Sequence, residues 1–298
     1  MSPSTFSIVA CDRSNGDLGV AVQSKFIAVG SIVPWARAGV GAVATQAWAN
    51  VGYGPNALGM LEEGLTAPQV LERLLRTEEN RDVRQIAIVD AKGNVAVHTG
   101  MKCMEWAGHV GGDGYSCQGN ILAGKEVVES MARAYDETDG DLVDRLLVAL
   151  SAGQKAGGDR RGQQSAALLV VRDKGGYEGF TDRYVDLRVD DSSAPIEELK
   201  RVFKVYDMTM LSREDPRNLL PIRDNVAKLL QRNLKKLGFY DGGTNGRYDE
   251  STRNALRDFV NVNNFENRMR EDGFIWESIL QYIDDSAKTK TKRSKKKR

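Results

Sequence analysis

Short apolar stretches separated by turn sequences dominate the first two-thirds of the chain. Residues 5–11 (TFSIVAC), 18–23 (LGVAVQ) and 40–46 (VGAVATQ) are apolar at most positions. Strands with this composition need cover on both faces. Asn15-Gly16 lies between the first two stretches and predicts a tight hairpin, which makes these two strands antiparallel. We therefore expect largely antiparallel sheets that are buried between further layers.

Helical patterns alternate with these strands. The clearest predicts a helix over 67–77, with Thr66 as its N-cap and Pro68 in its first turn. Other helices are expected at 55–63, 125–135, 141–152 and 195–211, and other strands at 30–33, 84–90, 95–99, 106–110, 115–118, 165–172 and 183–189. This order predicts an α+β fold with four layers, an αββα sandwich of helices, sheet, sheet and helices, over residues 5–211.

A second region follows a polar boundary. Residues 212–222 contain Pro216 and Pro221 and are expected to be a linker. Residues 223–285 then predict a small three-helix domain, with helices at 223–237, 249–262 and 272–283. Residues 286–298 are rich in lysine and are expected to form a disordered basic tail.

The charge of the chain is unevenly divided. The sequence has 42 Lys and Arg against 41 Asp and Glu, and residues 288–298 (KTKTKRSKKKR) hold eight of these cations and no acid. The remainder has 34 cations against 41 anions, which argues against a specific nucleic-acid partner. We expect the tail to bind polyanions weakly.

Cysteine content and hydropathy indicate the compartment. Three cysteines, an odd number, imply no disulfide framework and fit a reducing compartment. No apolar run approaches the roughly 18 residues of a membrane span, and the first residues do not form a signal sequence. We therefore expect a cytoplasmic protein without a membrane partner. The sequence leaves the oligomeric state open, and a homo-oligomer is one option.

Thr5 is the candidate nucleophile because it begins the first strand near the start of the chain. A threonine hydroxyl needs a base beside it, and a free α-amino group on the same residue has a reference pKa of about 7.7–8.0. This chemistry requires cleavage of the Ser4–Thr5 bond. Two alternatives remain open: Thr5 is an ordinary strand residue, or Ser2 becomes the nucleophile once Met1 is removed.

Six ordered sequence blocks carry a family resemblance. They are TFSIVA at 5–10, LGVAVQSKF at 18–26, AVG at 28–30, VPWA at 33–36, GVGAVATQA at 39–47 and GGDRRGQQSAA at 157–167. These blocks resemble the DUF1028 family, which is assigned to the Ntn-hydrolase-like superfamily. The resemblance implies the αββα sandwich and an N-terminal nucleophile. Members commonly have Met directly before the threonine, whereas this chain inserts Ser2-Pro3-Ser4.

Polar side chains at neighbouring strand ends are the candidates for assisting Thr5. Lys25 and Arg37 end the second and third strands, and a nearby cation would lower the pKa values of the amine and the hydroxyl. For the oxyanion we expect backbone N–H groups near Gln46 and the side chain of Asn50. The ordinary alternatives are a solvated lysine at a strand end and an asparagine in a turn.

Further polar residues are candidates for binding a substrate. Gln46, Gln118 and Asn120 lie at strand ends, and residues 157–164 place two arginines beside glycines, a combination that suits a substrate carboxylate. The alternative for this loop is local pairing of Asp with Arg at the surface. The candidates in the loop are Asp159, Arg160, Arg161 and Gln164.

No metal or cofactor is expected. His98, Cys103, His109 and Cys117 fall within 20 residues, but their spacing matches no paired zinc motif. The sequence also lacks a phosphate-binding P-loop motif.

The second region has a resemblance of its own. The residues LQ at 230–231, LGFYDG at 237–242 and NGRY at 245–248 are similar to the peptidoglycan-binding-like three-helix module. The resemblance implies a cell-wall fragment as ligand. Phe239, Tyr240 and Tyr248 either line an aromatic groove or belong to the core of the small domain.

These features together predict an N-terminal-nucleophile amidohydrolase without a cofactor. Its substrate would be a small-molecule amide or a peptidoglycan fragment. The alternative is a non-catalytic binding or scaffold protein on the same fold, because a fold does not determine a function.

Overall fold

The computed structural model describes residues 5–211 and 213–296. The chain divides into two compact units between Phe203 and Lys204. The strands of the first unit are β1 (Thr5–Asp12), β2 (Asp17–Ser24), β3 (Pro34–Arg37), β4 (Gly41–Ala47), β5 (Arg84–Asp90), β6 (Val95–Thr99), β7 (Gly108–Gly112), β8 (Tyr115–Asn120), β9 (Ser165–Val171) and β10 (Arg183–Val189). Its helices are α1 (Tyr53–Glu62), α2 (Ala67–Arg76), α3 (Glu126–Asp136) and α4 (Leu142–Lys155), and the division falls within α5 (Pro195–Met210).

Two antiparallel sheets face each other in the first unit. One has six strands in the order β10-β9-β2-β1-β8-β7, and the other has four in the order β3-β4-β5-β6. Apolar side chains of β1, β2 and β9 meet those of β4 and β5 in a shared core between the sheets. Strand β1 therefore lies inside the larger sheet, with β2 on one side and β8 on the other.

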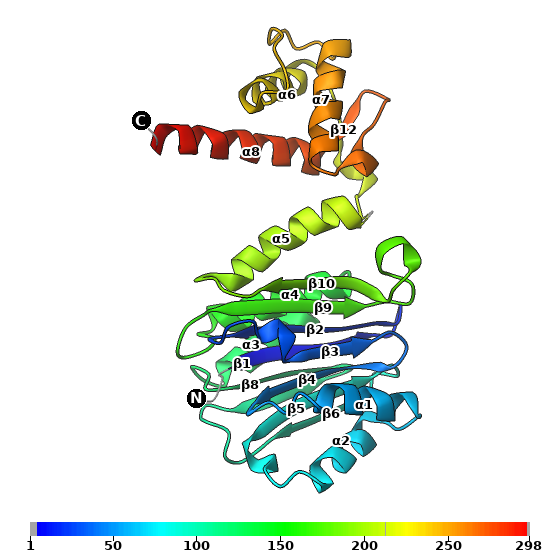
Figure 1. Cartoon of the computed structure of the whole chain (residues 1–298), viewed down its shortest axis with the longest axis vertical. Helices are drawn as coiled ribbons and strands as arrows, with labels where there is room; N and C mark the ends of the chain where they lie inside the picture. Colours follow the sequence, from blue (N-terminus) through cyan, green and yellow to red (C-terminus); the bar gives the residue numbers. More distant parts are fainter. Residues whose placement is uncertain (1–4, 212, 297–298) are drawn as a thin grey trace. The chain divides into compact units, whose positions relative to one another are not determined.

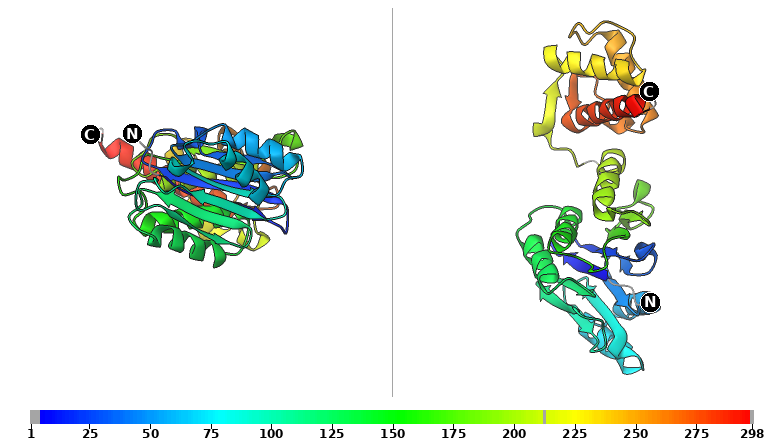
Figure 2. Two further views of the ribbon diagram at one scale, coloured as in Figure 1. Left: turned by 90° about the horizontal axis from the view of Figure 1, so that it is seen from below. Right: turned by 90° about the vertical axis from the view of Figure 1, so that its left-hand side faces the viewer.

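Helices cover the outer face of each sheet. α3 and α4 pack on the larger sheet, and α1 and α2 pack on the smaller one (Figure 1). The left-hand view of Figure 2 shows the strands between the green helices on one side and the light-blue helices on the other. The predicted order of helices, sheet, sheet and helices is thus present, in an α+β fold with antiparallel sheets.

One predicted turn is confirmed, and one predicted strand is wrong. Asn15-Gly16 closes the β1–β2 hairpin, where the Asn15 Oδ1 accepts a hydrogen bond from the Asp17 N–H at 2.9 Å. Residues 30–33 do not form a strand, because a 3₁₀ turn occupies Val29–Ser31. Ala28, directly before the turn, has a left-handed backbone with φ of 51°, which is not a strand conformation.

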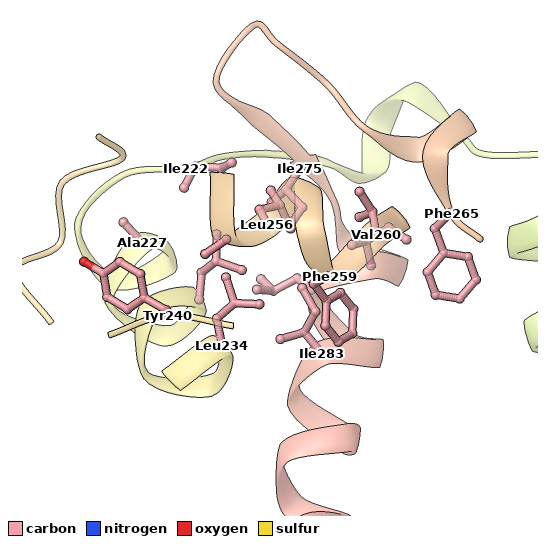
Figure 3. Close-up of a cluster of buried hydrophobic side chains, with 14 of the residues drawn as sticks. Ile222, Ala227, Leu234, Tyr240, Leu256, Phe259, Val260, Phe265, Ile275 and Ile283 are labelled. Atoms are coloured by element: carbon pink, nitrogen blue, oxygen red, sulfur yellow. The ribbon is translucent and has the colours of Figure 1, made fainter. Parts of the chain in front are cut away.

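In its described residues, the second unit contains the end of α5, three further α-helices and a two-stranded sheet. Its elements are β11 (Leu219–Pro221), α6 (Asp224–Leu237), α7 (Glu250–Val262), β12 (Phe274–Trp276) and α8 (Glu277–Lys296). Their apolar side chains meet in one core, which includes Leu234, Phe259 and Ile283 (Figure 3). β11 and β12 pair antiparallel. Part of the predicted linker 212–222 therefore belongs to this unit, and the helix predicted at 272–283 begins later, at Glu277.

The predicted disordered tail is helical as far as the structure describes it. α8 continues through Lys296, and Lys288 pairs with Asp284 one turn earlier. Opposite charges at this spacing stabilise a helix. The expectation of disorder is therefore corrected for residues 286–296, and residues 297–298 lie outside the described residues.

A buried arginine ties the end of α5 to the second unit. The side chain of Arg268 is 5 % exposed. Its guanidinium donates to the backbone carbonyls of Asp207, Met208 and Leu211. Carbonyls in the last turn of a helix lack partners within the helix, and the arginine supplies the missing donors. The last turn of α5 consequently belongs to the second unit, although the sequence predicts residues up to 211 in the first domain.

Arg268→Ala should lower the free energy of unfolding of the second unit by about 2–3 kcal/mol, because buried carbonyls lose a charged donor. Trp276 is the one tryptophan in residues 204–298. The ¹⁹F signal of 5-fluorotryptophan at this position reports unfolding of this unit in the full chain. Arg257→Ala is the matched control, because Arg257 pairs with Glu271 at the surface and such pairs contribute about 1 kcal/mol or less. Equal effects of the two substitutions would contradict the capping role.

Candidate active site

The layer between the two sheets changes from apolar to polar along β1. Val9 and Cys11 belong to the apolar core near the β1–β2 hairpin, whereas Ser7 and Thr5 are buried at the other end of the strand. Side chains two positions apart on a strand face the same side. The beginning of β1 therefore presents two hydroxyl groups to the space between the sheets.

Four amide side chains and one hydroxyl bridge the sheets at this end. The Gln118 Nε2 donates to the Ser7 Oγ at 2.7 Å, and the Ser7 Oγ donates to the Gln46 Oε1 at 2.7 Å. The Gln46 Nε2 donates to the Gln85 Oε1 at 2.8 Å, which also accepts from the Asn120 Nδ2 at 3.2 Å. We call these five residues the amide network. It joins β1 and β8 of the larger sheet to β4 and β5 of the smaller one.

The amide network is uncharged and fully buried. The Gln85 Nε2 adds hydrogen bonds to the carbonyls of Gly119 at 2.9 Å and Gly108 at 3.1 Å. Buried polar groups are tolerated when they have such partners, and removing one partner leaves the others with an uncompensated desolvation cost. The network therefore holds the two sheets in one relative position where β1 begins.

Thr5 lies beside the amide network at the first position of β1. Its Oγ1 is 3.1 Å from the Ser24 Oγ, across the β1–β2 pair. The Gln46 Nε2 lies 3.4 Å from the Thr5 carbonyl oxygen. On the other side, strand register places Asn120 directly opposite Thr5, so the two side chains share a face. The structure thus brings the predicted residues Gln46 and Asn120 to Thr5, which is only 1 % exposed.

The loop of residues 157–164 closes the same end of the strands. The buried carboxylate of Asp159 accepts a hydrogen bond from the Lys25 N–H at 2.7 Å, directly after the end of β2. The Arg160 N–H donates to the Ile121 carbonyl at 3.1 Å, directly after the end of β8. The loop is therefore attached to both strands that flank Thr5.

The side chains of this loop have separate environments. The Arg161 guanidinium pairs with the Asp159 carboxylate at 3.2 Å, which compensates a buried charge. The Gln164 Nε2 donates to the Asp191 carboxylate at 3.2 Å near the surface. The side chain of Arg160 is exposed. Of the two predicted arginines, Arg160 is therefore the one that is exposed to solvent and does not pair with Asp159.

The two predicted basic residues do not reach the Thr5 hydroxyl. The Lys25 Nζ is exposed and donates to a carbonyl of the 157–164 loop at 3.2 Å. Arg37 pairs with Gly41 in the β3–β4 ladder. Gly41 begins β4, and Gln46 lies near the other end of this strand. The five residues from Gly41 to Gln46 span roughly 17 Å. Because β3 and β4 are antiparallel, the last residue of β3 lies far from Thr5.

Asn50 belongs to a different cluster, around the Glu78 carboxylate. This carboxylate accepts hydrogen bonds from the Asn50 Nδ2 at 3.2 Å, the Tyr53 hydroxyl at 3.0 Å and the Asn80 N–H at 2.9 Å. It also pairs with Arg84 at 3.3 Å. Burial alone raises the pKa of Glu78, but these donors outweigh it and lower the pKa to about 2. The Asn50 amide is thus committed to Glu78, and it orders the loop after β4.

The three aromatic candidates of the second unit pack into its core. Tyr240 is buried, and Phe239 contacts Phe259 edge to face with ring centres 5.3 Å apart. Tyr248 packs on the same core and has the Arg253 guanidinium over its ring at 5.6 Å. Of the two roles that the sequence leaves open for these residues, the structure shows packing in the core.

The four potential metal ligands His98, Cys103, His109 and Cys117 have local partners or lie apart. The Cys103 Sγ donates to the Arg84 carbonyl at 3.4 Å, and the His109 Nδ1 is 3.0 Å from the Thr99 Oγ1. Within residues 5–211 and 213–296, no three His, Cys, Asp or Glu side chains are grouped so that they could hold a metal ion.

The sequence profile described as "Family of unknown function (DUF1028)" matches residues 5–199, which is more than half of the chain. The chain belongs to the DUF1028 family. A second profile, described as "Putative peptidoglycan binding domain", matches residues 209–283.

A solved structure supports the assignment to DUF1028. The crystal structure of a DUF1028 protein from Silicibacter pomeroyi matches with a TM-score of 0.63 and 29 % sequence identity, over 68 % of this chain and 86 % of that chain. Anbu, an ancestral beta-subunit from Yersinia bercovieri, matches with a TM-score of 0.31 and 8 % identity, over 70 % of this chain and 98 % of that chain. No curated protein matches the sequence.

Three residues of the candidate site are not predicted from the sequence: Ser7, Ser24 and Gln85. Each lies in a strand whose other buried positions are largely apolar. A polar residue at a position that faces the interior is the signal that could have identified them. The partners of Ser7 and Gln85 come from distant strands, which the sequence alone does not pair. Ser24 faces Thr5 across the predicted β1–β2 hairpin, and only the register of that hairpin was missing.

Gln85→Leu should lower the free energy of unfolding of the first unit by about 2–3 kcal/mol, because the Gln46 amide and two glycine carbonyls lose their partner. Chemical denaturation of the full chain measures the change. Gln164→Leu is the control, since this glutamine bonds at the surface. An equally small effect of both substitutions would show that the amide network does not hold the sheets together.

Glu78→Gln should destabilise the protein near neutral pH, because all partners of Glu78 are donors and an amide nitrogen cannot accept from them. The difference should shrink in acid. The ordinary pKa of 4.5 falls to about 2 on folding, so the unfolded chain binds more protons between these values. The stabilisation is complete above about pH 4.5 and is lost as the pH falls through about 2.

The measurement is the difference in denaturation free energy between wild type and Glu78→Gln from neutral pH down to about pH 2.5. Glu62→Gln is the control, because Glu62 forms an exposed pair with Arg37. A difference for Glu78→Gln that stays constant over this range would contradict the assigned pKa shift.

Proposed function

We propose that this DUF1028 protein is an Ntn-type amidohydrolase with Thr5 as its nucleophile. The observation that carries the proposal is the position of Thr5. It is the first residue of an inner strand, and its hydroxyl is 3.1 Å from the Ser24 hydroxyl in the polar layer between the sheets. The antiparallel four-layer architecture supports the resemblance to the Ntn-hydrolase-like sandwich.

Cleavage of the Ser4–Thr5 bond would supply the catalytic base. The freed α-amino group, with an ordinary pKa of about 7.7–8.0, takes the proton from the Thr5 hydroxyl. The hydroxyl oxygen then bonds to the amide carbonyl carbon. The C–N bond breaks, and the amine leaves with the proton. Water hydrolyses the resulting Thr5 ester, which releases the acid and restores the hydroxyl.

Neighbouring residues have distinct roles in this proposal. Ser24 orients the Thr5 hydroxyl. Asn120, opposite Thr5 and held by Gln85 at 3.2 Å, donates to the oxyanion, because a donor that is oriented before the reaction stabilises developing charge without reorganisation. Arg160 supplies a cation for a substrate carboxylate.

The second unit supports a cell-wall-derived substrate. Its profile match concerns peptidoglycan binding, and we propose that it holds a wall fragment while the first unit acts on an amide bond. No helix in the described ranges is both long and apolar enough to cross a membrane. The cytoplasmic location expected from the sequence stays a prediction, as does weak binding of polyanions by residues 288–298.

A non-catalytic binding protein is the second candidate. The burial of Thr5 in the uncleaved chain favours it, because a substrate cannot reach a hydroxyl that is 1 % exposed. The two candidates differ in the mature N-terminus, since only the hydrolase requires a chain that begins at Thr5.

Thr5→Ala should abolish amide hydrolysis, with a loss of at least about 10³-fold in kcat, because the nucleophile is gone. Thr5→Ser should keep measurable activity, since it retains a hydroxyl beside the amine. The assay is release of amine from a library of small amides and peptidoglycan fragments. Thr99→Ala is the control for general disturbance of the site, because it removes a partly buried hydroxyl that accepts a hydrogen bond from Gln85. Full activity of Thr5→Ala would rule out the mechanism.

A further inference from the structure

Exposed apolar side chains gather near the strand ends where Thr5 lies. Trp48 and Met104 are each 51 % exposed, and Met101 is 90 % exposed. Trp48 directly follows β4, and its N–H donates to the Val83 carbonyl, just before β5, at 3.3 Å. We call Trp48, Met101 and Met104 the apolar rim. Large apolar groups gathered on a surface are typical of a binding site.

The segment with the two methionines is held against β5 and β8. The Gly100 N–H and the Cys103 Sγ both donate to the Arg84 carbonyl, at 2.9 Å and 3.4 Å. The Ile121 N–H donates to the Met104 carbonyl at 2.9 Å. The apolar rim is therefore anchored at the beginning of β5 and the end of β8, which are two of the strands that supply the amide network.

Ile121 joins the apolar rim to the cationic loop. Its N–H bonds to Met104, and its carbonyl accepts the Arg160 N–H at 3.1 Å. Ile121 directly follows Asn120, which lies opposite Thr5. The segment with Met104 and the loop with Arg160 are thus both attached by backbone hydrogen bonds to the residue that follows Asn120.

Two unusual backbone conformations occur at these strand ends. Ala47, directly before Trp48, has φ of 66°, and Ile121 has φ of 52°. Residues other than glycine rarely adopt such angles, and β-branched residues least of all. Strained conformations of this kind concentrate at ligand-binding sites. Here both follow a member of the amide network and redirect the chain away from the sheet.

We propose that the site takes an amide with an apolar group on one side of the scissile bond and a carboxylate on the other. The apolar rim contacts the apolar group. Arg160 binds the carboxylate, since the neighbouring Arg161 is already paired with Asp159. N-acyl amino acids and N-alkyl monoamides of dicarboxylic acids share this chemistry. The inference rests on the proposed hydrolase function, which supplies the scissile bond.

The first experiment measures hydrolysis of two substrate series by the full chain. N-acylglycines from acetyl to octanoyl and N-alkylsuccinamic acids of the same chain lengths distinguish the two orientations. A fully buried methylene improves binding about fourfold, so a half-exposed rim should raise kcat/KM about twofold per methylene. Trp48→Ala and Met104→Ala should flatten this dependence. Phe180→Ala, which removes an exposed aromatic between β9 and β10, should leave it unchanged.

The second experiment tests the cationic side. Arg160→Gln should lower kcat/KM for N-octanoylglycine at least about tenfold, leave N-octanoylglycinamide unaffected and preserve the dependence on chain length. Arg183→Gln is the control, because Arg183 lies at the other end of the larger sheet, opposite Val171. An equal loss for the acid and the amide substrate would overturn the assigned role of Arg160.

A binding measurement separates this inference from the proposed function. N-octanoylglycine is titrated into the full chain labelled with 5-fluorotryptophan, and the Trp48 signal should shift while the Trp276 signal does not. Without hydrolysis, a Trp48 shift that grows with chain length and weakens in Arg160→Gln supports the ligand class and refutes the hydrolase. If the protein hydrolyses amides but kcat/KM depends on neither the chain length of the substrate nor Trp48, the ligand class is refuted and the hydrolase function is not. A change of oligomeric state in Trp48→Ala, measured by light scattering, would overturn the proposed ligand class. It would indicate that Trp48 contacts a second copy of the chain.

Discussion

The amide network that bridges the two sheets is the interaction on which the candidate site depends. Neighbouring strands in one sheet are aligned by backbone hydrogen bonds, but two stacked sheets have no such ladder between them. Elsewhere in this layer the sheets meet through apolar side chains, whose attraction is not directional. Directional bonds from Gln118 through Ser7 and Gln46 to Gln85 fix the sheets relative to each other where β1 begins.

The opposite end of the larger sheet uses charge instead. The Asp17 carboxylate is fully buried and is held by two hydrogen bonds from Arg172, which also stacks on Tyr184 at 3.8 Å and pairs with Asp141. This ion pair lies within the larger sheet and its helix layer and does not bridge the two sheets. The bridge between the sheets beside Thr5 consists of uncharged side chains. In the nearby loop, the charge of Asp159 is compensated by Arg161.

The sequence predicts the architecture well because the architecture depends on local patterns. The apolar strands, the Asn15-Gly16 hairpin and the helix after Thr66 are all encoded within a few residues. The site is less predictable, because it depends on which strand ends meet. Arg37 and Thr5 each lie at a strand end, yet strand direction separates them by most of the length of β4. Arg268 caps α5 but lies far from it in the sequence. Local composition therefore could not predict that the boundary between the two units falls within α5.

The mature N-terminus tests the central claim most directly. Thr5 can act as nucleophile and base only if it carries a free α-amino group. Intact-mass analysis of purified, active protein should show a chain that has lost Met1-Ser2-Pro3-Ser4 and begins at Thr5. Protein that hydrolyses amides while every molecule begins at Met1 or Ser2 would contradict the account.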